Sequence, residues 1–197
     1  MKELILEMEE YASLKNIPII EKDSIAFIMK FIKKNNIKNI LEIGSAIGYS
    51  TILMASASSD VTVTTIERDE ARYMECLKNV KKCGFEKKIN VVFQDALEVN
   101  LTGVKYDMIF IDAAKGQYIK FFEKFQYFLN DGGVIITDNL KFHGYVGKSK
   151  EIESKNLRGL AEKIENYIEF LKNNTDFETN FYDVGDGLSV SIKKDAK

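Results

Sequence analysis

Five short apolar runs between residues 39 and 138 constrain the fold more than any other feature of the sequence. They are rich in Ile and Val and comprise residues 39–43, 61–67, 89–95, 108–112 and 134–138. Runs of this length and composition are typical of strands that are buried on both faces of a parallel sheet. Most of them end in an acidic or amide residue, so these strands would deliver polar side chains to one edge of the sheet.

Segments with helical periodicity separate these runs. Residues 49–56, 69–83 and 117–129 each follow a predicted strand, and the aromatic side chains of the third recur at the spacing of a core-facing helix surface. Residues 1–36 predict two helices, the second over 23–35 with Asp23 or Ser24 as its cap. Residues 150–173 predict a long charged helix.

Two further strands, over residues 178–184 and 188–193, flank the turn Gly185-Asp186-Gly187 and predict an antiparallel hairpin. Strands that alternate with helices indicate right-handed βαβ units. We therefore predict an α/β fold: a Rossmann-like, doubly wound sheet of seven strands, mostly parallel, with helices on both faces. It would form one domain over residues 1–197, with a helical N-terminal region over 1–36.

The composition excludes several classes of protein. A net charge of −2, from 28 basic and 30 acidic side chains, argues against a protein that coats nucleic acid non-specifically. No run approaches the 18 apolar residues of a membrane-spanning helix, and the acidic N-terminus is unlike a signal peptide. The two cysteines have no second pair with which to form a metal site, and we expect free thiols in a cytoplasmic protein.

The turn after the first strand predicts a ligand site. Glu42 stands two residues before Gly44, and the spacing to Gly48 is G-x-x-x-G, unlike the G-x-G-x-x-G of a dinucleotide site. A carboxylate at Glu42 would repel a diphosphate but suits a ligand with an ammonium group. S-adenosylmethionine carries an ammonium group and a sulfonium, and we predict it as the cofactor.

Two further strand ends extend this predicted cofactor site. Glu67 could accept both ribose hydroxyls, and Asp95 could accept the adenine amino group while Ala96 supplies a backbone N–H. Acidic strand ends without a function are common in such folds. Features of this kind in register at successive strand ends nevertheless favour a ligand site at the carboxyl edge of the sheet.

The fourth and fifth strands predict a metal site and a catalytic base. Asp112, Asp138 and Asn139 would converge at neighbouring strand ends and offer the hard oxygen ligands that Mg²⁺ prefers. Asp138 alone could instead be a helix cap. Lys115 follows Asp112 by three residues, and with a lowered pKa it could remove the proton of a substrate hydroxyl. His143, the single histidine, is interpreted as a rim residue rather than a ligand.

With these residues assembled, nearly the whole chain resembles the cation-dependent O-methyltransferases related to catechol and caffeoyl-CoA O-methyltransferases. The segments that carry the resemblance are LEIGSAIGYS, TIERDE, FIDAAKGQY, IITDN and DVGDGLSVS. The resemblance implies S-adenosylmethionine and a metal as cofactors, Asp112 at the metal and beside the cofactor, and Lys115 as the catalytic residue.

Within that family the chain is most similar to the bacterial tRNA 5-hydroxyuridine methyltransferases, through EMEEYASLKNIPII, DAAKGQY and the N-L-R helix. This similarity implies a homodimer that forms 5-methoxyuridine at the tRNA wobble position, with Ile20, Tyr49 and Ser50 bordering the cofactor. Two departures are Gln94, where the family often has glycine, and the unusual segment 140–143. The second bears on substrate contacts.

One feature of the residues themselves supports an RNA substrate. From Lys141 to Arg158 five basic residues face two acidic ones, a local charge of +3. We predict an RNA-facing rim that comprises Lys141, His143, Lys148, Lys150 and Arg158. A solvated charged helix is the alternative for this segment. A small-molecule catechol-type methyltransferase, a nicotinamide oxidoreductase and a noncatalytic RNA-binding module remain as rival functions.

Overall fold

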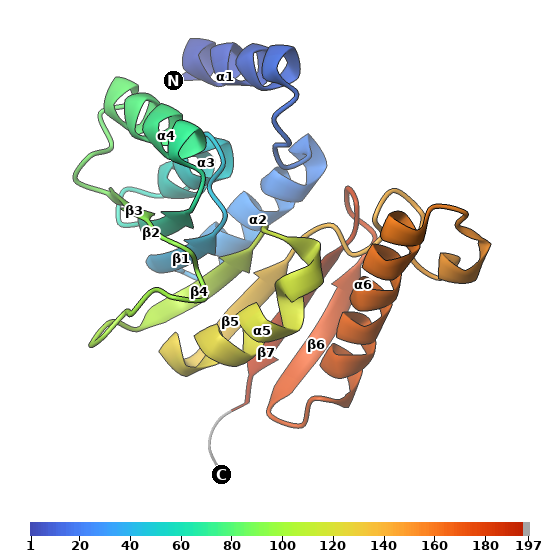
Figure 1. Cartoon of the computed structure of the whole chain (residues 1–197). Coiled ribbons are helices and arrows are strands. Elements are labelled where there is room, and N and C mark those ends of the chain that lie inside the picture. The colour runs from blue at the N-terminus through green and yellow to red at the C-terminus, as the bar shows by residue number, and fades with distance from the viewer. Residues whose placement is uncertain (195–197) are drawn as a thin grey trace.

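The computed structural model describes residues 1–194; the last three residues of the predicted domain, 195–197, lie outside the described part. Seven strands form one sheet in the order β3-β2-β1-β4-β5-β7-β6 (Figure 1). Their bounds are β1 Asn39–Ile43, β2 Thr62–Glu67, β3 Ile89–Phe93, β4 Tyr106–Ile111, β5 Leu129–Thr137, β6 Phe177–Tyr182 and β7 Leu188–Lys193. The first five are parallel, and β7 pairs antiparallel with both β5 and β6, which confirms the predicted fold class.

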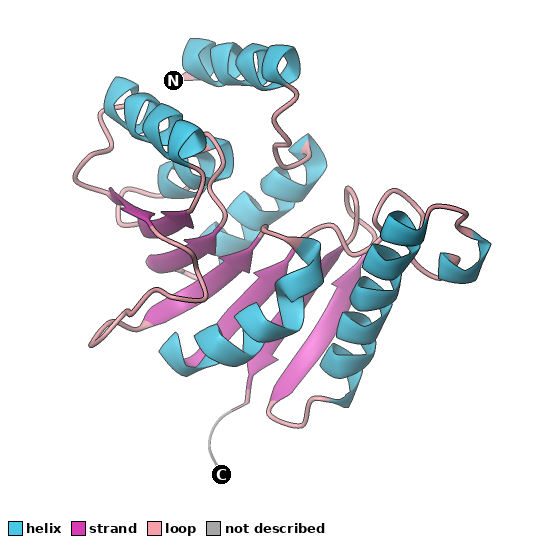
Figure 2. Cartoon of the chain, in the orientation of Figure 1, coloured by secondary structure: helices cyan, strands magenta, loops and turns pink. Residues whose placement is uncertain are grey.

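Helices cover both faces of the sheet (Figure 2). On one face, α1 (Lys2–Lys15), α2 (Lys22–Lys34), α3 (Tyr49–Ser56) and α4 (Glu70–Lys82) share a core with Ile40 of β1. On the other, α5 (Tyr118–Phe125) and α6 (Lys155–Asn173) share a core with Leu41 and Ile43. Because successive strand residues point to opposite faces, Glu42 lies on the same side as Ile40, beneath α3.

Several predicted boundaries differ from the structure. Neither Asp23 nor Ser24 caps α2, which starts at Lys22; Ser24 is buried inside the first turn, and its hydroxyl faces Asp138. The helix predicted over 117–129 is a short α5 between two 3-10 turns, Lys115–Gln117 and Gln126–Phe128. The helix predicted from residue 150 starts at Lys155, because Ser149–Glu151 forms a separate 3-10 turn.

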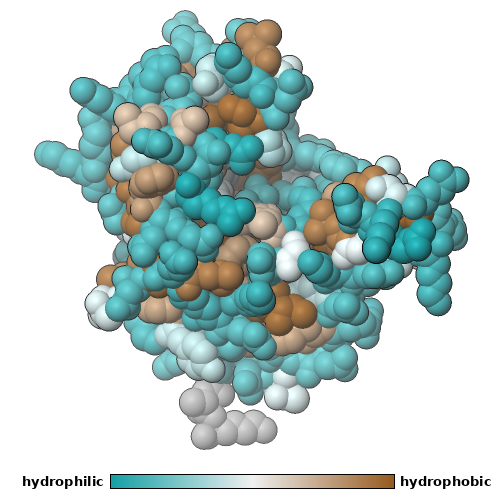
Figure 3. All heavy atoms as spheres, in the orientation of Figure 1, coloured by the Kyte–Doolittle hydropathy of each residue, from teal (hydrophilic) through white to brown (hydrophobic). Residues whose placement is uncertain are grey.

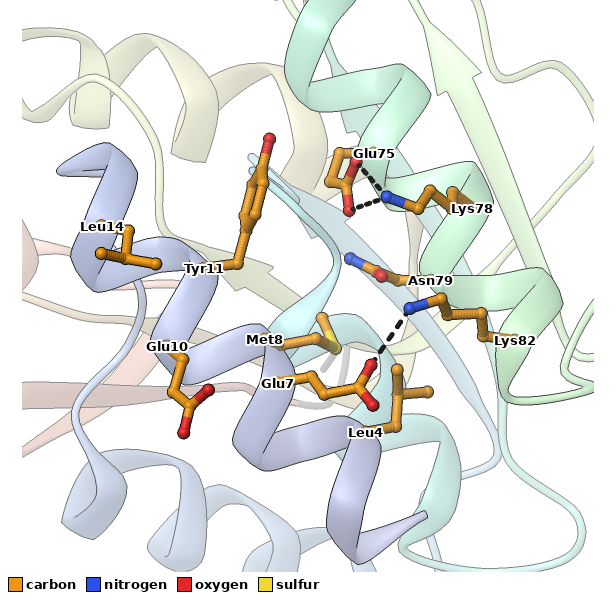
Figure 4. A pocket seen from close by; sticks show the side chains of 10 residues that line it. All are labelled: Leu4, Glu7, Met8, Glu10, Tyr11, Leu14, Glu75, Lys78, Asn79 and Lys82. Carbon is orange, nitrogen blue, oxygen red and sulfur yellow. Dashed lines mark hydrogen bonds and ion pairs between the residues drawn. The ribbon is translucent and has the colours of Figure 1, made fainter.

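Helix α1 packs on α4 rather than directly on the sheet. Met8 is buried between the two helices, and Glu7 forms an ion pair of 3.1 Å with Lys82 (Figure 4). A cavity of about 290 Å³ remains beside these contacts. Next to Met8 on the same helix, Glu9 accepts hydrogen bonds from Tyr49 of α3 at 2.8 Å and from Lys22 of α2 at 2.7 Å. Helix α1 is thus tied to the helices that border the carboxyl edge of the sheet.

The loop after β5 projects from the body of the molecule. Residues 138–154 connect β5 to α6, and in the space-filling view a recess lies between the outer part of this connection, the 140–154 loop, and the α1–α4 region (Figure 3). Among residues 1–194, no helix has the length and apolar character needed to cross a membrane.

Candidate active site

A cavity of about 730 Å³ opens at the carboxyl ends of the first five strands. The segment 18–21, between α1 and α2, forms part of its wall. The predicted site residues that line it are Ile20, Gly44, Tyr49, Ser50, Glu67, Asp95, Ala96, Asp112, Lys115, Asn139 and His143. The structure therefore gathers most of the predicted cofactor, metal and catalytic residues around one space, where ligands of open α/β sheets bind.

The turn after β1 brings two strands close together at this cavity. Gly44 has φ +94°, and a Cβ at this position would overlap the carbonyl oxygen of Asp112. Its N–H donates to the Ile66 carbonyl at 2.9 Å, while the Asp112 N–H donates to the Ile43 carbonyl at 3.1 Å. Glycine is required here because both the backbone conformation and the space exclude a side chain.

Glu42 does not line the cavity, contrary to the prediction that it faces an ammonium group. It is completely buried, and its carboxylate accepts hydrogen bonds from the hydroxyls of Thr65 at 2.6 Å, of Ser50 at 2.5 Å and of Thr51. Burial raises its pKa to about 7, against the effect of these hydroxyls. Glu42 therefore lies behind the cavity wall, where its hydrogen bond fixes the side chain of Ser50, a residue that lines the cavity.

Glu67 reaches the cavity with its carboxylate already fixed. Its Oε2 accepts the N–H of Ala46 at 2.9 Å, and its Oε1 accepts those of Arg68 and Asp69, also at 2.9 Å. A carboxylate offers about four acceptor sites, so one remains at Oε2 for a ligand hydroxyl. The position of Glu67 fits the predicted contact with a ribose.

Asp95 and Ala96 border the same cavity next to β3. Asp95 accepts the Leu97 N–H at 2.8 Å and pairs with Arg68 at 3.1 Å. Both contacts lower the pKa of Asp95, and the hydrogen bond from the Leu97 backbone has the larger effect. The aspartate is thus held as an anion beside the cavity, as hydrogen-bond acceptance from an amino group requires.

Asp112, Asp138 and Asn139 meet where β4 and β5 end. The Asn139 amide donates to Asp112 Oδ1 at 3.0 Å, and the Asn139 N–H donates to Asp138 Oδ1 at 2.8 Å. Asn139 adopts φ +66°, a conformation that asparagine tolerates better than most residues. The predicted convergence of the three side chains is therefore present, although Asp138 itself lies just behind the cavity wall with 2% exposure.

The ionised forms of the two aspartates in this cluster are disfavoured. Burial, and then the charge of Asp112, raise the pKa of Asp138 to about 7. Burial also raises the pKa of Asp112, against the opposing effects of Lys115 and Asn139. The pKa of Lys115 is lowered by burial, against Asp112, Asp138 and Asp186, which raise it. Two neighbouring carboxylates, one half-buried and one buried, favour a bound cation.

The donor set fits a divalent cation of the Mg²⁺ type. It consists of carboxylate and amide oxygens, the ligands that hard cations prefer, and Lys115 is the single basic side chain that acts on the pKa of Asp138. Residues 1–194 contain no cluster of three or more His, Cys, Asp or Glu side chains arranged to hold a metal ion. The candidate site is thus two aspartates and one asparagine, with room for other ligands from the cavity.

Asp186 belongs to this cluster and was not predicted. It lies in the turn between β6 and β7, is 7% exposed, and is near enough for its charge to raise the pKa of both Lys115 and Asp138. Its position follows from the sheet order: β7 lies against β5, which brings the hairpin turn beside Asp138. The two glycines in the sequence predict the turn, but no local sequence pattern predicts that β7 pairs with β5.

The predicted RNA rim is only partly free to contact a ligand. Lys141 forms an ion pair with Asp183, and the Arg158 guanidinium donates to the Ile152 carbonyl at 2.7 and 2.9 Å. Both therefore stabilise the 140–154 loop. Lys148 and Lys150 are exposed, and neither takes part in an ion pair within the described chain.

Comparison with known proteins shows which family the chain is similar to. The family model described as O-methyltransferase matches residues 1–194. Tapetum-specific methyltransferase 1 of Arabidopsis thaliana is 32% identical over 95% of this chain and 85% of its own length. Flavonoid 3',5'-methyltransferase of Vitis vinifera is 28% identical over 96% and 83%, respectively.

Solved structures agree with the fold. A Staphylococcus aureus protein assigned as a caffeoyl-CoA O-methyltransferase superposes with a TM-score of 0.92 and 41% identity, covering 96% of this chain and 91% of the other. An O-methyltransferase from Bacillus cereus, solved in complex with SAH, superposes with a TM-score of 0.84 at 24% identity, covering 98% and 91%. At that identity the second comparison supports the fold alone.

Proposed function

The chain belongs to the O-methyltransferase family, and on that premise we propose that it uses Mg²⁺ and S-adenosylmethionine to methylate the 5-hydroxyl of 5-hydroxyuridine at the tRNA wobble position. The product is 5-methoxyuridine. One observation carries the reaction type: Lys115, with a pKa lowered by burial, shares a cavity wall with Asp112, Asn139 and the cofactor residues. S-adenosylmethionine as methyl donor also agrees with the family.

Each residue of the site has a separate role in the proposed reaction. Glu67 and Asp95 accept hydrogen bonds from the ribose and the adenine, and so fix the methyl donor in the cavity. Asp112, Asp138 and Asn139 would hold a divalent cation, which would supply positive charge beside the acceptor hydroxyl. Lys115 in its neutral form takes the hydroxyl proton, the C–S bond of the sulfonium breaks as the C–O bond forms, and the donor leaves as a thioether.

The 140–154 loop supports an RNA acceptor. Lys148 and Lys150 place two exposed positive charges on the loop that follows the metal ligands, where phosphates would approach. Tyr145, 38% exposed, lies between them and His143 in the sequence and packs against Phe142 with ring centroids 5.4 Å apart. An exposed aromatic ring beside basic residues suits the stacking of an unpaired base.

Mass spectrometry of tRNA nucleosides tests this acceptor. Unmodified and 5-hydroxyuridine-containing tRNA would be incubated with the protein, methyl-labelled S-adenosylmethionine and Mg²⁺. We expect labelled 5-methoxyuridine from the hydroxylated tRNA alone, and none from the Lys115→Ala variant. Turnover of a catechol panel without any labelled tRNA nucleoside would contradict the RNA assignment while leaving the methyl transfer intact.

A small-molecule acceptor is the second candidate, favoured by the names of relatives such as the flavonoid methyltransferase. A catechol offers two neighbouring hydroxyls to the same metal and lysine, and the exposed lysines of the 140–154 loop are the feature that favours RNA instead. We further propose that the enzyme is a cytoplasmic homodimer, as the resemblance to the tRNA enzymes implies. Light scattering of the purified protein tests the dimer.

A further inference from the structure

The Asp186 carboxylate has one satisfied and one unsatisfied oxygen. Oδ1 accepts the backbone N–H of His143 at 2.7 Å, whereas Oδ2 is buried without a hydrogen-bond partner in the described residues. Leaving a buried carboxylate oxygen unpaired costs free energy, so such an atom calls for a partner. A candidate donor is His143 Nδ1, which lies 3.7 Å from Oδ2.

His143 connects this buried carboxylate with the cavity. Its side chain is 68% exposed, and the residue lines the cavity together with Lys115 and Asn139. Its backbone adopts φ +55°, and Phe142 before it adopts φ +48°, so the loop turns sharply to present the ring. Residues other than glycine rarely adopt this conformation, and here the Asp186 bond holds it in place.

We propose that Asp186 is a positioning residue, whose Oδ2 accepts a hydrogen bond from Nδ1–H of His143 and so leaves Nε2 unprotonated toward the cavity. A neutral imidazole carries one proton, and a carboxylate beside Nδ1 decides which nitrogen holds it. Nε2 is then a hydrogen-bond acceptor for an N–H or O–H group of the methyl acceptor, next to the hydroxyl that is methylated. This role rests on the proposed function, because it needs an acceptor molecule in the cavity.

The separation of 3.7 Å closes by a small movement of the exposed ring, whereas the carboxylate is fixed. Besides the Oδ1 bond, the Lys141 N–H donates to the Asp186 carbonyl at 2.7 Å, and the Leu140 N–H donates to the Gly187 carbonyl at 3.0 Å. These backbone bonds tie the loop to the hairpin turn without the side chain. Catalytic hydrogen bonds are often long in ligand-free structures and tighten when the ligand binds.

The variant Asp186→Asn separates positioning from support of the loop. Its amide oxygen can keep the bond to the His143 N–H, but its NH₂ group then faces His143 Nδ1 and favours the opposite tautomer. Exchange of an aspartate for asparagine beside a catalytic histidine acts in this way in serine proteases. The expected consequence is a wrongly placed imidazole proton in a folded protein.

Nitrogen NMR of the imidazole reads the tautomer directly, because His143 is the single histidine of the chain. With ¹⁵N-histidine-labelled protein in alkaline buffer, we expect the Nδ1–H form to predominate in the wild type and the Nε2–H form in Asp186→Asn. Equal tautomer ratios in the two proteins would overturn the proposal. This readout needs no methyl acceptor, so it stays informative if the proposed RNA substrate is wrong.

A double-mutant cycle tests the kinetic consequence. We expect Asp186→Asn and His143→Ala each to raise the KM for the hydroxylated RNA about tenfold, with S-adenosylmethionine affinity unchanged, and the double variant to be no worse than His143→Ala. The rates are compared on the pH plateau, since Asp186 also acts on the pKa of Lys115. Additive losses would show that Asp186 acts independently of His143 and would contradict the proposal.

Discussion

The Asn139 amide donates to Asp112 Oδ1 at 3.0 Å and so joins the end of β5 to the end of β4. This bond links two of the three predicted metal ligands across neighbouring strands. Asn139 and Asp112 would hold a divalent cation through their amide and carboxylate oxygens, the ligands that hard cations prefer.

Stability without metal is expected to fall as the pH rises. The folded-state pKa of Asp138 is raised to about 7, above its unfolded value, so the unfolded chain binds fewer protons between roughly pH 4 and 7. Deprotonation over that interval therefore favours unfolding, at a cost of roughly 2–4 kcal/mol for this group. Calorimetry with a chelator should give a lower Tm at pH 8 than at pH 5, and Mg²⁺ should raise Tm more at pH 8.

The variant Asp138→Asn provides the control for this prediction. Because the amide does not titrate, we expect a smaller loss of Tm between pH 5 and pH 8, and a smaller shift on addition of Mg²⁺. The Glu42 contribution remains in both proteins, so their difference isolates Asp138. A variant whose pH dependence and Mg²⁺ shift equal those of the wild type would refute the metal assignment.

Lys115 is expected to set the acidic limb of the pH–rate profile. A base must be neutral to accept a proton, so kcat should rise with pH through the pKa of Lys115, which lies below its usual value. Lys115→Arg keeps the charge but cannot lose a proton, and should lower kcat about 10²- to 10⁴-fold. Lys120→Arg, at an exposed position of α5, is the matched control. A Lys115→Arg profile with unchanged height and limb would contradict the role.

The sequence predicts the strand ends well because burial and chain direction act locally. Isoleucine- and valine-rich runs determine where strands lie, and parallel strands bring Asp112, Asp138 and Glu67 to one edge. The same local patterns predict seven strands and the antiparallel hairpin, and the structure contains them. What lies between the strands depends more on packing, which explains the shorter α5 and the displaced starts of α2 and α6.

Side-chain roles that depend on nonlocal neighbours were harder to predict. The sequence predicts a ligand contact for Glu42, but the pleat of β1 turns this side chain toward Thr65 and Ser50, away from the cavity. Asp186 has no comparable signal in the sequence, because the nonlocal pairing of β7 with β5 brings it to the cluster. The predicted RNA contact of Arg158 stays a prediction, and the sequence did not indicate that its Nε and Nη2 also donate to the Ile152 carbonyl six residues earlier.

Glu67 is expected to control the affinity for the methyl donor. In Glu67→Gln, the amide nitrogen cannot accept the backbone N–H groups that now hold the carboxylate, and the charge beside the ribose is lost. We expect the Kd of S-adenosylmethionine to rise about 10- to 100-fold by calorimetry, from the loss of charge-assisted hydrogen bonds. Glu70→Gln, exposed in the first turn of α4, should bind normally. Normal binding by Glu67→Gln would remove Glu67 from the site.

Tyr145 is expected to contribute to RNA binding through its ring. Tyr145→Ala should raise the KM for hydroxylated tRNA about tenfold, because a stacked base loses its platform, while Tyr145→Phe should retain the wild-type value. Turnover of a catechol should change little in either variant. An equal effect of both substitutions would assign the loss to the hydroxyl rather than to stacking.

The charges of Lys148 and Lys150 are expected to make the reaction with RNA depend on salt. In the double variant Lys148→Glu/Lys150→Glu, two exposed positive charges of the 140–154 loop are reversed, and the KM for tRNA should rise well above tenfold at low salt. The slope of log KM against log salt concentration should decrease by about 1.4, because two phosphate contacts are lost and each contributes to the slope through the counterions that it releases from a single strand. The control variant Lys33→Glu/Lys34→Glu, at the C-terminal end of α2, changes the net charge of the protein by the same amount. It should leave the KM for tRNA and its salt dependence unchanged. If the loop variant and this control respond alike, the dependence arises from the overall charge, and the loop would not be the surface that binds RNA.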